Sequence, residues 1–98
     1  MDQLIVGRKL DSLMRCLARV RDKCPADAEI LRRDLDLQDV LVLNLSRAVQ
    51  ICVDLAVHLL STWGLPPPES MGRSFDQLVD AGVLDEALAL RMKKAVGF

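Results

Sequence analysis

Six polar side chains that could do chemistry recur at steps of three and four through the otherwise apolar segment 36–63. They are Asn44, Arg47, Gln50, Asp54, His58 and Ser61. At about 100° per residue, a helix places them on one sector of roughly a third of its circumference. Such a line offers a carboxylate, a guanidinium that can bind phosphate and an imidazole that can move a proton. It must form the protein's outer wall, a cleft or a subunit seam.

Single members of this line are weaker evidence for function than the line as a whole. A single histidine such as His58 is more often a hydrogen-bonded surface or core residue than a catalyst. Arg47 could contact a phosphate or a partner protein, since its planar fork suits both. We therefore take Arg47, Gln50 and His58 as candidates for cleft or partner contacts.

The three cysteines, Cys16, Cys24 and Cys52, do not form a disulfide framework or a familiar zinc pattern. Their number is odd and no two are spaced as CxxC. Cys16 and Cys52 lie within apolar helical patterns, where cysteine behaves as a small hydrophobic residue. Cys24 precedes Pro25 at an expected helix end and should be more exposed. No metal ion or cofactor is expected.

The composition favours one small all-α domain. Of the 98 residues, 51% are hydrophobic but only 3% aromatic, and leucine dominates. Leucine favours helices, whereas sheets are rich in aromatic and β-branched residues. Polar residues interrupt the long apolar segment too often for a membrane span, and the N-terminus does not resemble a signal peptide. A cytoplasmic protein is expected.

Charge is uneven although the net value is −1. Residues 8–23 hold six basic and two acidic residues, a local charge of +4, while residues 36–98 carry −3. The basic stretch is either an ordinary solvated helix face or a surface that modestly attracts phosphates or an acidic partner. The chain lacks the overall positive charge of a dedicated nucleic-acid binder.

Apolar periodicity and capping residues predict four or five helices. The expected segments are 4–23, 28–33, 36–63 with Asp36 as N-cap and Gly64 as stop, 70–81, and a last helix that Asp85 caps and that has not clearly ended at Gly97-Phe98. The inward positions are Val6, Leu10, Leu13, Leu17 and Val20 in the first helix, Phe75, Leu78 and Val79 in the fourth, and Leu88, Met92 and Val96 in the last.

Short connections favour an antiparallel bundle with the first and third helices as its long central pair. The third helix, roughly 40 Å long, is longer than its neighbours can easily cover. Exposed apolar surface on a small domain usually marks a partner. A two-fold homodimer through the third and last helices is the simplest expectation.

Several separate segments resemble the HepT-like branch of the HEPN superfamily in order and spacing. They are the first helix, the Arg47-x2-Gln50-x3-Asp54-x3-His58 pattern, the prolines before Glu69-Ser70, and the terminal Gly97-Phe98. The resemblance covers essentially the whole chain. It implies a small helical homodimer that pairs with a minimal nucleotidyltransferase antitoxin. It also implies a toxin that is a metal-independent endoribonuclease, silenced when the partner transfers adenylate to a tyrosine.

The sequence departs from the family at its end. In the family, Gly-Phe is followed by Arg-x4-His-x-Tyr, which supplies the acid–base and phosphate-binding groups. Here Phe98 is the last residue, so no catalytic residue of that motif is present, and His58 cannot take its role. We expect residues 1–98 to be a single HepT-like domain truncated at its C-terminus, and inactive on RNA alone.

The resemblance gives Asp54 a possible supporting role. In the superfamily, a polar residue of the central helix faces the catalytic helix, where a carboxylate could orient the missing arginine or histidine. The alternative is a local solvated pair with Arg47 or His58. The rival function is a non-catalytic helical module that docks to a nucleotidyltransferase or presents its substrate.

Overall fold

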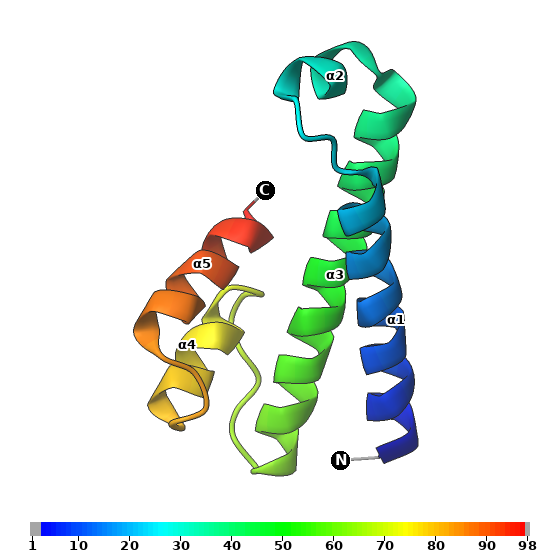
Figure 1. Ribbon diagram of the computed structural model, residues 1–98. Coiled ribbons are helices and arrows are strands. Elements are labelled where there is room, and N and C mark those ends of the chain that lie inside the picture. The colour runs from blue at the N-terminus through cyan, green and yellow to red at the C-terminus, as the bar shows by residue number, and fades with distance from the viewer. Residues whose placement is uncertain (1–2, 98) are drawn as a thin grey trace.

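The computed structural model describes residues 3–97, and within that range the protein is all-helical (Figure 1). The helices are α1 (Gln3–Lys23), α2 (Ala28–Arg33), α3 (Leu35–Thr62), α4 (Arg73–Asp80) and α5 (Glu86–Val96). α1 and α3 run antiparallel as the long central pair, with α2 at the end where they connect. α4 and α5 form a shorter hairpin against the C-terminal half of α3. The predicted all-α bundle is confirmed.

Side-chain caps set where the helices begin, and one differs from the prediction. α3 begins at Leu35 because the Asp34 carboxylate accepts a hydrogen bond from Leu37 N at 2.9 Å. Asp34 has an extended backbone between α2 and α3, so it serves as the N-cap in place of Asp36. Asp36 lies in the first turn. Asp85 caps α5 as predicted, by accepting from Leu88 N at 2.7 Å.

Helix ends also follow from local chemistry. Gly64 has a φ of +68°, a conformation that lets it stop α3 just after the C-cap residue Trp63. α4 begins at Arg73 rather than near Ser70, whose hydroxyl accepts from Arg73 N at 3.3 Å across a turn. α5 does end within the chain, contrary to expectation: Gly97 is its C-cap, and its N–H donates to Lys93 O at 3.3 Å. Phe98 lies outside the described residues.

The core lies where α4 and α5 pack against the C-terminal half of α3. Its buried members are Val53, Ala56, Leu60, Phe75, Leu78 and Ala89. The inward prediction for Phe75 and Leu78 is therefore confirmed. Val79, Met92 and Val96 are partly buried against the same cluster. This core fixes α5 relative to α3.

Two predicted apolar stripes hold in part. Val6, Leu13 and Val20 of α1 and Met92 and Val96 of α5 are partly buried, but the most buried residue of each helix is a smaller neighbour of a predicted one. In α1 the buried residue is Cys16, while Leu10 and Leu17 are 45% and 37% exposed. In α5 it is Ala89, at 2%, while Leu88 is 41% exposed. Small side chains at the contact let helix axes approach closely, and the larger neighbours then lie at the flanks. Periodicity finds the face of a helix but not which residue is at its centre.

α3 by itself is long and apolar enough to cross a membrane, with a mean hydropathy of 1.7 over 18 of its residues. The central helix of a soluble bundle can have the same length and composition. Here α3 packs on α1 and on the α4–α5 hairpin. Its apolar composition is that of a helix with neighbours on more than one side.

Candidate functional site

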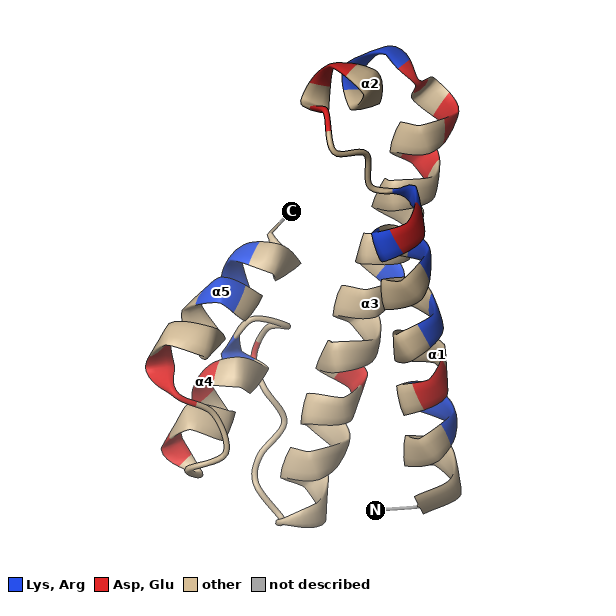
Figure 2. Ribbon diagram, in the orientation of Figure 1, with Lys and Arg blue, Asp and Glu red and all other residues tan. Residues whose placement is uncertain are grey.

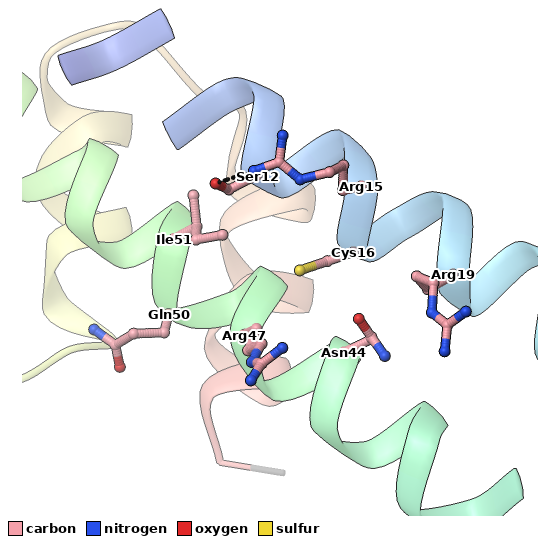
Figure 3. Close-up of a pocket in the computed structure, with 8 residues that line it drawn as sticks. All are labelled: Ser12, Arg15, Cys16, Arg19, Asn44, Arg47, Gln50 and Ile51. Atoms are coloured by element: carbon pink, nitrogen blue, oxygen red, sulfur yellow. Dashed lines mark hydrogen bonds between the residues drawn. The ribbon is translucent and has the colours of Figure 1, made fainter. Parts of the chain in front are cut away.

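The polar line of α3 changes its surroundings along the helix. Asn44 is buried and donates from Nδ2 to Val40 O at 2.8 Å. Arg47 and Gln50 are exposed and line an open pocket between α1 and α3 (Figure 3). Asp54 is half-buried, and the last two members of the line are exposed. The first half of the line is thus the wall of a cleft.

This pocket, which we call the arginine pocket, has a volume of about 530 Å³. It is lined by Ser12, Arg15, Cys16, Arg19, Asn44, Arg47, Gln50 and Ile51. The α1 residues recur at steps of three and four, so one face of α1 presents them toward α3. Arg15 Nη2 donates to Ser12 Oγ at 2.9 Å (Figure 3). The pocket is therefore lined by three cations and by no carboxylate.

Asp54 joins α1 to α3. Its Oδ2 lies 3.2 Å from Lys9 Nζ, and its Oδ1 accepts from Gln50 Nε2 at 3.0 Å. The expected alternative, a local pair of Asp54 with Arg47 or His58, is wrong. α1 packs close enough for a lysine to reach the carboxylate, whereas sequence spacing reveals only neighbours on the same helix. Gln50 connects this ion pair to the arginine pocket.

Of the three cysteines and His58, only Cys16 lines the arginine pocket. His58 is exposed, and its backbone carbonyl accepts from Thr62 Oγ1 at 3.0 Å. Cys16 is buried and Cys24 exposed, as predicted. Burial raises the pKa of the Cys52 thiol. Within residues 3–97, no three His, Cys, Asp or Glu side chains are grouped to hold a metal ion.

A second groove, of about 480 Å³, lies between α3 and the end of α5. Its lining is mostly apolar and comprises Leu45, Ser46, Val49, Gln50, Met71, Lys94, Ala95 and Val96. Gln50 lines both this groove and the arginine pocket. This α3–α5 groove is lined at one end by Val96, next to Gly97, the last residue that the structure describes.

The structure brings together part of the predicted set and adds residues from α1. Gln50 is hydrogen-bonded to Asp54 and shares the arginine pocket with Arg47, whereas His58 lies outside this group. Sequence reasoning did not single out Lys9, Arg15 or Arg19 individually. The basic charge of residues 8–23 was a signal, but only the pairing of α1 with α3 shows which of those cations face the polar line.

Comparison with known proteins gives a consistent result. The family model for ribonuclease HepT-like proteins matches residues 13–98. The mRNA nuclease HepT of Shewanella oneidensis is 31% identical over 93 residues, which make up 95% of this chain and 69% of that protein.

Solved structures agree with the sequence match. A tri-AMPylated Shewanella oneidensis HEPN toxin in complex with MNT antitoxin is 31% identical, with a TM-score of 0.89 over 99% of this chain and 71% of that one. A toxin–antitoxin structure with AMP-PNP is also 31% identical, with a TM-score of 0.88 over 95% of this chain and 70% of that one. The chain therefore belongs to the HepT-like family.

Proposed function

We propose that this chain is the toxin-type subunit of a nucleotidyltransferase–HepT toxin–antitoxin pair, and that the complete protein is a metal-independent endoribonuclease. The observation that carries the proposal is the match to a HEPN toxin over 99% of the chain at 31% identity. That toxin is in complex with an MNT antitoxin. The curated relative at the same identity is an mRNA nuclease.

The proposed chemistry needs groups that residues 1–98 do not supply. Cleavage without metal requires a base for the ribose 2′-hydroxyl and a cation for the phosphorane charge. The chain has one histidine, on α3, and no tyrosine. We propose that an Arg-x4-His-x-Tyr motif follows Phe98 in the complete protein. It would then begin beside the α3–α5 groove.

The proposed roles of the α3 residues follow from their contacts. Asp54 is held by Lys9 and Gln50, and Gln50 also lines the α3–α5 groove. The Asp54 carboxylate would then act on the motif through Gln50 rather than by direct contact. Arg47 is proposed as a phosphate contact. His58 is kept as a candidate for contact with a protein partner.

We further propose a homodimer that binds a minimal nucleotidyltransferase antitoxin in the cytoplasm. Apolar side chains remain exposed along α3, with Val42 and Leu43 at 49% and Leu45 at 36%. Leu45 also lines the α3–α5 groove, so the exposed surface is continuous with the last helix. A second copy covering this region would remove it from water.

The test compares this 98-residue chain with a version extended through an Arg-x4-His-x-Tyr motif. Both are incubated with total RNA in EDTA, and cleavage is followed on a gel. The extended chain should cleave and the short chain should not, because only the former has the acid–base pair. Cleavage by both at similar rates would show that the motif is not the catalytic group.

The alternative function is a non-catalytic helical module that docks to a nucleotidyltransferase or presents its substrate. The apolar side chains that α3 exposes, among them Val42 and Leu43, offer a surface for such docking. Inactivity of both versions on RNA, together with binding of the nucleotidyltransferase, would support this alternative.

A further inference from the structure

The arginine pocket concentrates positive charge in a chain whose net charge is −1. Basic residues recur along α1 (Figure 2), and Arg15 and Arg19 line the pocket from that helix. Arg47 reaches it from α3, and in Figure 3 the guanidinium groups of Arg19 and Arg47 lie on either side of Asn44. The folded chain therefore brings Arg47 of α3 into one pocket with two cations of α1.

No carboxylate neutralises these cations within residues 3–97. The ion pairs of that range engage other basic residues, namely Lys9, Arg32, Arg33, Arg73 and Lys93. Like charges that share a pocket repel one another, and a bound anion would relieve that repulsion. Guanidinium groups are always charged and donate two parallel hydrogen bonds to phosphate oxygens. The chemistry of the pocket is thus that of a phosphate site.

The shape and lining of the pocket favour an extended polyanion. It is open to solvent, and the three arginines are exposed, so it does not enclose a small ligand. No aromatic side chain lines it. Proteins that read unpaired bases stack them on aromatic rings, whereas contacts to the backbone alone are independent of sequence. We therefore expect the pocket to contact the phosphate backbone of such a polyanion.

We propose that the arginine pocket binds backbone phosphates of single-stranded RNA, as a holding site separate from the cleavage motif. This inference rests on the proposed function, which supplies RNA as the substrate. The pocket would hold a flanking stretch of the strand while the motif acts elsewhere. Binding there should show little preference for base sequence.

The experiment measures binding of a short fluorescent single-stranded RNA to the 98-residue chain by anisotropy, over a range of salt concentrations. Each phosphate contact to a single strand contributes about 0.7 to the slope of log affinity against log salt, so three contribute about 2. The triple variant Arg15→Gln, Arg19→Gln, Arg47→Gln should lose that part of the slope. When salt is raised from about 50 to 200 mM, both proteins lose affinity. The factor lost by the wild type should be roughly 20 times the factor lost by the variant.

Two matched variants separate phosphate binding from general charge and from folding. Arg21→Gln, Arg32→Gln, Arg33→Gln removes the same charge outside the pocket and should keep most of the wild-type slope. Replacing the three pocket arginines by lysine should restore most of the slope, which a purely structural role of arginine would not predict. Circular dichroism verifies that all variants are folded.

Each outcome decides the inference. Equal slopes for the pocket variant and the wild type, or no RNA binding by the wild type at low salt, would overturn it. Binding of ATP but not of RNA would identify a small-anion site and also overturn it. Cleavage by the motif-extended chain is measured separately. That activity can persist when the pocket variant binds RNA normally, in which case this inference fails while the proposed function stands.

Discussion

Asp54 is the residue at which two long helices and the polar line meet. Its side chain is 38% exposed and that of Lys9 is 29% exposed, so water screens their ion pair. Pairs of this kind contribute about 0.2–1 kcal/mol. The contact therefore adds little to the stability of the α1–α3 pair, which packs along much of its length.

Replacing Asp54 by alanine should lower the free energy of unfolding by less than about 1 kcal/mol. In a complete protein the same change should reduce RNA cleavage, because Gln50 loses its hydrogen-bond partner. A double-mutant cycle with Lys9→Ala, measured by urea unfolding, gives the coupling energy, and Asp39→Ala is an exposed control on α3. A loss above about 3 kcal/mol would instead identify Asp54 as a buried structural partner.

The cysteines differ in reactivity because burial disfavours the thiolate. The pKa of Cys52 is raised above its ordinary value of 9.0, so its thiolate forms at a higher pH in the folded chain than in the unfolded chain. The stabilising contribution of protonated Cys52 is complete below the unfolded pKa and declines as the pH rises toward the folded value. Unfolding therefore becomes easier above about pH 9.

Alkylation near about pH 8 should modify exposed Cys24 first and Cys52 much more slowly. Peptide mapping by mass spectrometry measures the two rates. Labelling of Cys52 should accelerate at higher pH or in urea. Equal rates for both cysteines in the folded protein would contradict the burial of Cys52.

At the scale of elements, short polar side chains decide where helices start. Asp34 separates α2 from α3 and satisfies an N–H group in the first turn of α3. Asp85 does the same for α5. Because α3 contacts every other helix, its stability affects the whole bundle.

Asp34→Ala should therefore cost about 1 kcal/mol in the free energy of unfolding, which is typical of a lost N-cap. Asp36→Ala should cost less, since it removes only a charge near the helix N-terminus, worth about 0.3–1 kcal/mol. Thermal unfolding of the two variants gives the comparison. A larger effect at Asp36 would mean that α3 starts later in solution.

The whole molecule is elongated. Its dimensions are 47 × 28 × 19 Å, and its radius of gyration of 15.2 Å exceeds the roughly 13 Å expected for a compact chain of this length. The α4–α5 hairpin covers only the C-terminal half of α3 (Figure 1). The other half has α1 and α2 as neighbours and exposes apolar side chains.

Sedimentation at tens of micromolar should therefore show a dimer. Leu45→Glu should weaken it, because a charge would enter the proposed seam at the α3–α5 groove. Ile30→Glu changes an exposed apolar residue on α2, outside the proposed seam, and should leave the dimer intact. A wild-type monomer under these conditions would contradict the proposed seam.

The sequence by itself determined the all-α class, the central pair of long helices, the Asp85 cap and the family. These rest on periodicity, capping chemistry and motif order, which are local properties of the chain. Only the tertiary structure decided which small residues, Cys16 and Ala89, lie at the helix contacts. It also decided that Asp54 pairs with Lys9, and that arginines from α1 and α3 share one pocket. Those outcomes depend on how one helix is rotated and shifted against another, and side-chain packing between helices sets that geometry.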